Sequence, residues 1–240
     1  MSRLAWLKRH LHSPYYGVRR LLETHVVGSA AQEWLWRTRH LYKGTQWARS
    51  YCETIHHPHR PLLVAAIAEF APLAAILEVG CNAGPNLYLL AQSLPAARLY
   101  GLDINPRAIE IGRRWLREAG VHNVELAVGK ADDLGRFGDR SMDVVFTDAL
   151  LMYLGPDKIG GVLDEMLRVI RKGLVCVEWH RPATRGARGS YYYDAHWVHS
   201  FDALLRQRVP QAAIHINGLP DEAFGDAGWG QFGAIVTVRL

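Results

Sequence analysis

The amino-acid sequence predicts an α/β fold, in which helices cover both faces of a mostly parallel sheet. From residue 75 onward, short aliphatic runs alternate with stretches of helical length, and this alternation is typical of a parallel sheet. Several of the runs are apolar at successive residues rather than at every second one. Strands that are buried on both faces have this pattern, so the sheet is expected to lie between two layers of helices.

Seven strands are expected along the chain. Five come first, at residues 75–79, 97–103, 124–128, 143–148 and 174–179. A helix near 200–207 precedes two more strands, at 212–217 and 234–240. Because no crossover helix separates the last two strands, we expect them to pair in antiparallel fashion.

Proline and glycine mark the helix boundaries in this region. Three helices are expected to begin near Pro85, Pro106 and Pro156, because proline is favoured in the first helical turn. Gly120 and Gly173 are expected to end helices, because glycine readily adopts the left-handed backbone found there.

Residues 1–60 differ in composition from residues 61–240 and are expected to form a basic helical extension of the main domain. They contain ten Lys and Arg against three Glu, whereas the remainder contains 18 basic and 20 acidic residues. Ser29 and Gln32 have the spacing of a capping box, and Gly44 marks the end of the helical segment that would follow. We expect the extension to act as a lid or as a cap that binds substrate.

Two alternatives for the extension stay open. Leu4, Leu7 and Leu11 recur at helical spacing among basic residues, a pattern that suits peripheral contact with an anionic membrane surface. The excess of positive charge would also suit RNA phosphates, although no RNA-binding module is recognisable. A small-molecule or glycan-type substrate is therefore preferred over a nucleic acid.

The cysteines and the hydropathy pattern exclude several classes of protein. Cys52, Cys81 and Cys176 are widely spaced and odd in number, so neither a disulfide framework nor a cysteine zinc site is expected. No apolar run approaches the roughly 20 residues that a membrane-spanning helix needs, and the first residues lack the apolar core of a signal peptide. A cytoplasmic location is the expectation.

Residues 76–87, ILEVGCNAGPNL, have the features of a nucleotide-binding turn. Gly80 and Gly84 allow positive φ and a close approach to a ligand, and the amides that begin the next helix would face an anionic group. A nicotinamide fingerprint needs glycines where Asn82 and Pro85 stand, so that cofactor is disfavoured. Asn82 is expected to have a positive φ, which asparagine adopts readily, or to lend its amide to the cofactor.

Four motifs follow one another along the chain: EVGCNAGPN, GLDINP, GKADDL and DVVFTDALLMYL. Together they resemble the motifs of the class I S-adenosylmethionine-dependent methyltransferases. The resemblance covers about residues 76–179. It implies a Rossmann-like seven-stranded sheet with an antiparallel last strand, and S-adenosyl-L-methionine as the cofactor.

The resemblance also implies which residues bind the cofactor. Glu78 would orient the loop, Asp103 would hold the ribose, and Ile104 would pack on the adenine. The full set expected at the cofactor is Glu78, Gly80, Cys81, Asn82, Gly84, Asn86, Asp103, Ile104, Ala131, Asp132, Thr147 and Asp148. Arg60, which precedes the first motif in TIHHPHRP, is expected near the carboxylate of the cofactor.

The catalytic candidates are Asp148, Tyr153 and His180. An activated methyl group needs alignment above all, and a base only where the acceptor is protonated. His180 has the side chain whose pKa best suits that role near neutrality. Asp148 and Glu178 stand where some O-methyltransferases bind a metal, but the usual acid–amide pair is missing, and the histidines of residues 56–59 lack complementary ligands. No metal is expected.

The expected function is methyl transfer to a small-molecule, glycan or lipid-linked acceptor, at oxygen. The aromatic segment 190–201 would form one wall of the acceptor site. An RNA methyltransferase is one alternative, and a catalytically silent subunit that binds the cofactor as a scaffold is another. The sequence indicates neither the acceptor nor an oligomeric state.

Overall fold

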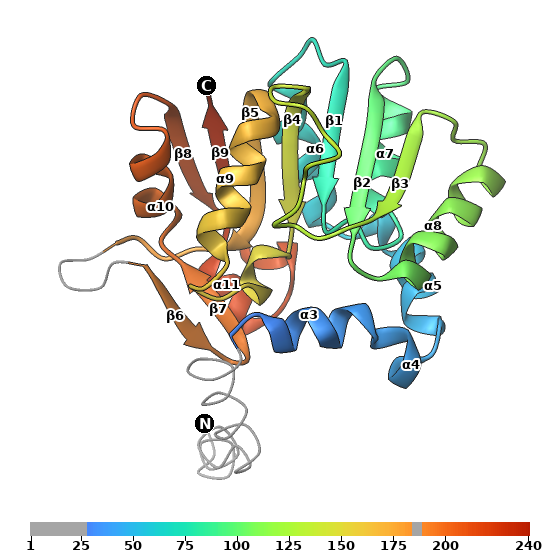
Figure 1. Ribbon diagram of the computed structural model, residues 1–240, viewed down its shortest axis with the longest axis horizontal. Coiled ribbons are helices and arrows are strands. Elements are labelled where there is room, and N and C mark those ends of the chain that lie inside the picture. Colours follow the sequence, from blue (N-terminus) through green and yellow to red (C-terminus); the bar gives the residue numbers. More distant parts are fainter. Residues whose placement is uncertain (1–27, 184–188) are drawn as a thin grey trace.

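The chain folds around one seven-stranded sheet with helices on both faces (Figure 1). The computed structural model describes residues 28–183 and 189–240. The strands are β1 (Ala75–Val79), β2 (Arg98–Asp103), β3 (Val124–Val128), β4 (Met142–Asp148), β5 (Ile170–Trp179), β8 (Ala213–Gly218) and β9 (Gly233–Arg239). Their order is β3-β2-β1-β4-β5-β9-β8. The seven predicted strands are therefore confirmed.

The pairing follows the prediction as well. Strands β1 to β5 run parallel, and β9 is antiparallel to both of its neighbours, β5 and β8. Because the chain passes from β1 to β2 on one side and to β4 on the other, the connection direction reverses between β1 and β4. Open α/β sheets bind ligands beside such a reversal, at the carboxyl ends of the strands.

Helices form one layer on each side of the sheet. They are α6 (His59–Ala68), α7 (Pro85–Ser93), α8 (Pro106–Glu118), α9 (Ile159–Val169), α10 (Phe201–Arg208) and α11 (Ala227–Phe232). One apolar core joins α6, α7, α8 and α11 to one face of the sheet, and a second core joins α9 and α10 to the other. Figure 1 shows α9 and α10 in front of the sheet and α6 behind it.

Two of the predicted helix boundaries are wrong. α9 begins at Ile159, three residues after Pro156. It ends at Val169, and Gly173 lies inside β5. Gly173 is needed there because a side chain would overlap the Phe70 ring and the Val238 carbonyl. The boundaries at Pro85, Pro106 and Gly120 are confirmed.

The described part of the N-terminal extension is helical. It comprises α3 (Ala30–Arg37), α4 (Arg39–Lys43), α5 (Gln46–Glu53) and the 3-10 turn η1 (Thr54–His56). Gly44, with a φ of 64°, ends α4 as predicted. The predicted boundary between residues 60 and 61 falls inside the first turn of α6. The segment with Leu4, Leu7 and Leu11 lies outside the described residues.

The predicted capping box at the start of α3 is not formed. The Ser29 side chain makes no capping bond to α3. Its hydroxyl donates to Asp157 Oδ1 at 2.9 Å and accepts from the Gly155 amide at 2.6 Å. This contact fixes the start of α3 to the segment after β4, so that α3 lies across the carboxyl ends of the strands (Figure 1).

The aromatic segment after β5 contains a hairpin that was not predicted. β6 (Ser190–Tyr193) pairs with β7 (His196–His199), and Asp194 and Ala195 both have positive φ at the turn. Alanine rarely adopts that conformation, so Asp194 is the one typical turn residue there. Across residues 28–183 and 189–240, no helix combines the length and apolar character needed to cross a membrane.

Candidate active site

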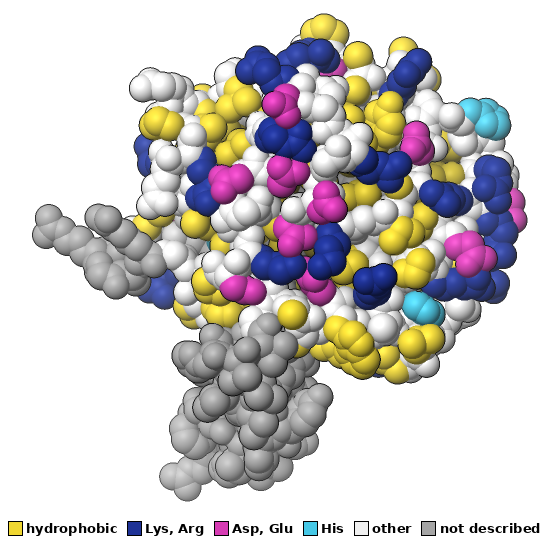
Figure 2. Space-filling view, viewed as in Figure 1, with side chains coloured by type: hydrophobic (Ala, Val, Ile, Leu, Met, Phe, Trp, Pro, Cys, Tyr) yellow, Lys and Arg dark blue, Asp and Glu magenta, His cyan; other side chains and the backbone are white. Residues whose placement is uncertain are grey.

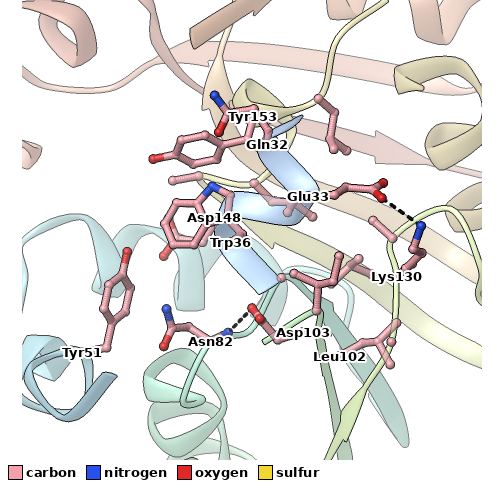
Figure 3. A pocket seen from close by; sticks show the side chains of 18 residues that line it. Gln32, Glu33, Trp36, Tyr51, Asn82, Leu102, Asp103, Lys130, Asp148 and Tyr153 are labelled. Atoms are coloured by element: carbon pink, nitrogen blue, oxygen red, sulfur yellow. Dashed lines mark hydrogen bonds and ion pairs between the residues drawn. The ribbon is translucent and has the colours of Figure 1, made fainter. Parts of the chain in front are cut away.

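A cavity lies at the carboxyl ends of β1, β2 and β4, and α3 covers it from the other side (Figure 3). The residues that line it are Gln32, Glu33, Trp36, Tyr51, Val79, Gly80, Asn82, Leu102, Asp103, Ile104, Gly129, Lys130, Ala131, Asp148, Ala149, Leu150, Tyr153 and Leu154. Six of the predicted cofactor residues belong to this set: Gly80, Asn82, Asp103, Ile104, Ala131 and Asp148. The structure therefore brings the turn after β1, the end of β2 and the end of β4 to one cavity.

The turn after β1 forms the floor of the cavity. Gly80 and Gly84 have φ of 81° and 84°, and Asn82 has a φ of 50°, which confirms the predicted positive φ. The Asn82 amide donates to Asp103 Oδ2 at 2.8 Å, and the Asn105 amide donates to Asp103 Oδ1 at 2.8 Å. The turn and the end of β2 are thus held in one arrangement through the Asp103 carboxylate.

The floor also presents polar groups that suit a ligand. Burial raises the pKa of Asp103, and its two amide hydrogen bonds offset this only in part. Asn82 Oδ1 is buried and has no hydrogen-bond partner among the described residues. Buried polar atoms are rarely left unpaired. A ligand with hydroxyl and amino groups would satisfy these acceptors, so the residues present fit the cofactor that the sequence motifs imply.

Glu78 lies behind the wall of the cavity and is not among its lining residues. Its Oε1 accepts from Asn86 Nδ2 at 2.7 Å, while Oε2 is buried with no partner among the described residues. Burial raises the pKa of Glu78 to about 8, and the charges of Asp148 and Asp103 contribute in the same direction. A positively charged ligand nearby would lower that pKa again.

Three side chains hold Asp148 through hydrogen bonds. Its Oδ2 accepts from His59 Nε2 at 2.8 Å, Asn86 Nδ2 at 3.0 Å and Arg60 Nη1 at 3.3 Å. Burial raises the pKa of Asp148, but the hydrogen bond and charge of His59 and the charge of Arg60 outweigh burial and lower it. Asp148 is therefore ionised at neutral pH.

Arg60 and Asn86 support Asp148 from behind. Besides its contact with Asp148, Arg60 donates to the Asn86 side chain and to the carbonyl and hydroxyl of Thr54. Neither Arg60 nor Asn86 is among the residues that line the cavity. The predicted role of Arg60 at the cofactor carboxylate is therefore not supported by a position in the cavity lining. Its hydrogen bond to Asp148 instead supports a role in fixing that carboxylate.

Aromatic side chains form the wall opposite the floor. The Tyr153 ring meets Trp36 edge-on at 4.9 Å and His196 at 5.1 Å, and Tyr51 lines the same cavity. Burial raises the pKa of both Tyr51 and Tyr153. Their hydroxyls stay protonated at neutral pH and can donate hydrogen bonds. Figure 3 shows Trp36, Asp148 and Tyr153 close together above Asn82 and Asp103.

His180 lies in a different hollow, with Pro182, Asp202 and Arg206. Its Nδ1 accepts from the Phe201 amide at 3.3 Å, and burial lowers its pKa. The structure therefore brings Asp148 and Tyr153 together but does not bring His180 to them. The reason is that the chain after β5 turns away from the cavity, toward the isolated bridge between His180 and His199.

Glu178 has a structural role. Its carboxylate accepts from the amides of Leu150, Leu151 and Met152 at 2.9 to 3.1 Å. These bonds fix the segment after β4, which carries Tyr153. Among residues 28–183 and 189–240, no group of three or more His, Cys, Asp or Glu side chains is arranged to hold a metal ion.

The remaining predicted residues lie outside the cavity lining. The Asp132 carboxylate accepts from Lys158 Nζ at 2.7 Å. Cys81, Gly84 and Thr147 are in or beside the apolar core rather than on the cavity surface. Sequence reasoning missed the contributions of α3 and α5 to the cavity, Gln32, Glu33, Trp36 and Tyr51, although it expected the extension to act as a lid.

The strand order and the cavity at the ends of β1, β2 and β4 define a Rossmann-like methyltransferase domain. Residues 76–173 match the family model described as a methyltransferase domain. Residues 76–173 are therefore similar to methyltransferase domains, and the sheet around them has the fold of class I S-adenosylmethionine-dependent methyltransferases. S-adenosylmethionine is the cofactor of this family.

Several named proteins are similar to the chain. Demethylmenaquinone methyltransferase of Listeria welshimeri is 32% identical over 138 residues, which cover 56% of this chain and 53% of that protein. The protein of the same name from Geobacillus stearothermophilus is 35% identical over 120 residues, or 49% of this chain and 50% of that one. The chain thus matches about half the length of these relatives.

Solved structures show the same fold at lower sequence identity. A SAM-dependent methyltransferase from Aquifex aeolicus is 16% identical and has a TM-score of 0.54, over 79% of this chain and 97% of that one. A geranyl diphosphate methyltransferase in complex with SAM is 15% identical and has a TM-score of 0.58, over 75% and 84% of the two chains. At this identity the likeness concerns the fold alone.

Proposed function

We propose that the protein transfers a methyl group from S-adenosylmethionine to a ring carbon of a small aromatic acceptor, of the reduced quinone class. The observation that carries this proposal is the apolar and aromatic wall beside Asp148. Trp36, Tyr51, Leu150 and Tyr153 lie there. A flat, largely apolar ring suits such a wall better than a sugar or a polyanion. The relatives named demethylmenaquinone methyltransferases support the same acceptor class.

The residues of the cavity divide between the two ligands. Gly80, Asn82, Asp103 and Ile104 would hold the cofactor, which when bound supplies a methyl group activated by a positive sulfonium. Tyr153 borders the acceptor and would donate a hydrogen bond to one of its oxygens. A hydroquinone ring carries nucleophilic carbons, whereas a quinone ring is electron-poor. The reduced form is therefore the expected substrate.

Labelled cofactor tests the proposal directly. Protein, S-adenosylmethionine with a deuterated methyl group and 1,4-naphthohydroquinone are incubated without oxygen, and the product is analysed by NMR and mass spectrometry. Label on a ring carbon is the expected result. Label on oxygen would instead support the acceptor atom that the sequence predicts. Cofactor binding with no transfer would favour a silent binding subunit, and transfer to RNA would favour the nucleic-acid alternative.

A surface next to the cavity favours a lipid-soluble acceptor. Trp34, Leu41 and Tyr42 are 63%, 75% and 50% exposed on α3 and α4, where Figure 2 shows hydrophobic side chains along the lower edge of the molecule. The exposed Arg37 and Lys43 lie on the same two helices. Exposed aromatic and basic residues together suit the interface of an anionic membrane. We propose peripheral contact there, through which the acceptor would reach the cavity.

Sedimentation with lipid vesicles tests the membrane contact. The protein is expected to pellet with vesicles that contain phosphatidylglycerol and to stay in solution with phosphatidylcholine alone. Combined substitution of Trp34→Ala and Leu41→Ala is expected to reduce pelleting about tenfold or more, because each buried apolar side chain contributes about 1.5–3 kcal/mol. Equal pelleting of variant and wild type would exclude this surface.

A further inference from the structure

The Asp148 carboxylate presents one oxygen to the protein and the other to the cavity. Its Oδ2 accepts from His59 Nε2, Asn86 Nδ2 and Arg60 Nη1, whereas no described residue donates to Oδ1. Asp148 lines the cavity, where Figure 3 shows it below Tyr153. We propose that Asp148 Oδ1 accepts a hydrogen bond from a ring hydroxyl of the acceptor and thereby selects the reduced form over the oxidised quinone. This inference rests on the proposed function and assigns the choice of oxidation state to one residue.

The contacts of Asp148 keep its carboxylate ionised. Burial raises the pKa of Asp148, but the hydrogen bond and charge of His59 and the charge of Arg60 outweigh burial and lower that pKa. An ionised carboxylate accepts hydrogen bonds and donates none. Asp148 Oδ1 can therefore pair with a hydroxyl group of a ligand but not with a carbonyl oxygen.

Two histidines behind Asp148 fix which of its oxygens is free. Because the ionised carboxylate cannot donate, the proton in the 2.8 Å contact with Asp148 belongs to His59 Nε2. In a neutral His59 ring Nδ1 is then the acceptor, and His57 Nδ1, 2.6 Å away, donates to it. Both imidazoles also pack on the Phe224 ring, at 4.3 and 5.0 Å. Oδ2 is thus occupied by a fixed donor, and Oδ1 is the oxygen that a ligand can reach.

The two oxidation states of the acceptor differ in what they offer to Asp148. A hydroquinone carries hydroxyl groups, which both donate and accept hydrogen bonds, whereas a quinone carries carbonyl oxygens, which only accept. The hydroquinone can donate to Asp148 Oδ1. The quinone would place a partly negative oxygen beside it and displace the water that could pair with it. Because a buried charge without a hydrogen-bond partner is costly, the quinone is expected to bind more weakly.

Tyr153 does not distinguish the two forms. Burial raises its pKa, so its hydroxyl stays a donor at neutral pH. A donor can pair equally with a hydroquinone oxygen and with a quinone carbonyl. Tyr153 would therefore bind an oxygen of either form, and the discrimination falls to Asp148.

The other carboxylates that line the cavity are Glu33 and Asp103, and both are less suited to this role. The two oxygens of Asp103 already accept from the amides of Asn82 and Asn105. Glu33 pairs with two lysines, Lys130 and Lys158. Among the described residues of the cavity lining, Asp148 is thus the carboxylate with an oxygen left for the acceptor.

Binding of an unreactive pair of ligands tests the selection. The probes are 2,3-dimethyl-1,4-naphthohydroquinone and the corresponding quinone, whose ring carbons beside the oxygens are already methylated, and S-adenosylhomocysteine replaces the methyl donor. Dissociation constants are measured by equilibrium dialysis without oxygen. The wild type is expected to bind the hydroquinone about 10- to 100-fold more tightly than the quinone, the factor that corresponds to one hydrogen bond to a charged group.

A matched pair of variants assigns the preference to Asp148. Asp148→Asn removes the charge and supplies an amide that can donate to a carbonyl, so it is expected to lose the preference. Asp133→Asn makes the same change in an exposed aspartate outside the cavity lining and is expected to keep it. Both variants are expected to bind S-adenosylhomocysteine like the wild type. If Asp148→Asn keeps the preference and instead binds S-adenosylhomocysteine more weakly, Asp148 faces the cofactor and the proposal is overturned.

Ethers of the probe supply a test on the wild type that does not depend on the folding of a variant. The diether, 1,4-dimethoxy-2,3-dimethylnaphthalene, has no hydroxyl and is expected to bind as weakly as the quinone. The monoether keeps one hydroxyl and is expected to bind nearly as tightly as the hydroquinone, which controls for the bulk of the methoxy group. Tight binding of the diether, weak binding of the monoether, or equal affinities for hydroquinone and quinone would overturn the selection by Asp148, while methyl transfer to a ring carbon would still stand. A wild type that shows the preference but transfers no methyl group would overturn the proposed function alone.

Discussion

The Asn105 side chain joins two helices that are 68 residues or more apart in sequence. Its Nδ2 donates to the Trp36 carbonyl at 2.6 Å, at the end of α3. Its Oδ1 accepts from the amides of Arg107 and Ala108, at the start of α8. Since Asn105 is fully buried and follows Asp103 by two residues, the helix that covers the cavity is tied to the strand end that forms its floor.

Substitution of Asn105 is expected to weaken both the fold and the cover of the cavity. Asn105→Ala removes the helix cap and the bond to Trp36, and is expected to lower the free energy of unfolding by about 1–3 kcal/mol. Asn105→Asp keeps the capping oxygen but cannot donate, so a smaller loss is expected. Urea unfolding measures both. If Asn105→Asp is as stable as the wild type, the bond to Trp36 contributes nothing to stability.

Glu33 is expected to control how fast the cofactor leaves. Its carboxylate accepts from Lys130 Nζ at 2.8 Å and also pairs with Lys158, so it joins α3 to the segments after β3 and β4. Because these pairs are partly exposed, Glu33→Gln is expected to change stability by less than about 1 kcal/mol. It is expected to speed the release of S-adenosylhomocysteine a few-fold, as measured by stopped-flow fluorescence.

The exposed Glu53, on α5, offers a control for that measurement. Glu53→Gln removes the same charge but is expected to leave the release rate unchanged. Higher salt concentration is expected to speed release from the wild type and to have little effect on Glu33→Gln, because salt screens charge pairs near the surface. Equal rates for all three proteins would show that the two ion pairs do not hold α3 over the cavity.

The sequence predicted the local features of the site better than the long-range ones. The positive φ of Asn82 and the position of Asp103 each depend on residues close by in sequence, in the turn after β1 and at the end of β2. The contacts of Trp36 with Asn105, and of His59 with Asp148, join residues 69 and 89 positions apart. No local pattern indicates such pairs. His180 was misplaced for the same reason, because its position depends on the hairpin β6–β7, whose turn has no typical turn residue beyond Asp194.

Glu78 is expected to make stability depend on pH. Its folded-state pKa of about 8 lies above the ordinary value of 4.5, so between these values the folded protein holds a proton that the unfolded chain has released. The free energy of unfolding therefore falls as pH rises from about 4.5 to about 8. Glu78→Gln keeps an oxygen that accepts from Asn86 and does not ionise, so this contribution to the slope is expected to be absent.

Unfolding of the two proteins at several pH values measures this difference. Glu78→Gln is expected to gain stability relative to the wild type as pH rises, by up to about 1.4 kcal/mol for each pH unit in that range. It is also expected to bind S-adenosylmethionine more weakly, because it lacks the nearby buried carboxylate that a cationic cofactor would favour in its ionised form. Parallel stability curves for the two proteins would contradict the assignment of the raised pKa to Glu78.

Tyr153 is expected to act through its protonated hydroxyl. Because burial raises its pKa, the hydroxyl is a hydrogen-bond donor throughout the neutral range. Tyr153→Phe keeps the ring contacts with Trp36 and His196 but removes the donor, so kcat is expected to fall about tenfold, the factor that corresponds to about 1.4 kcal/mol. Cofactor affinity, measured by calorimetry, is expected to stay unchanged.

The matched control for this measurement is Tyr88→Phe, because Tyr88 packs on Trp115 outside the cavity lining. If Tyr153→Phe keeps the kcat of the wild type while binding the cofactor equally well, the hydroxyl does not contact the acceptor.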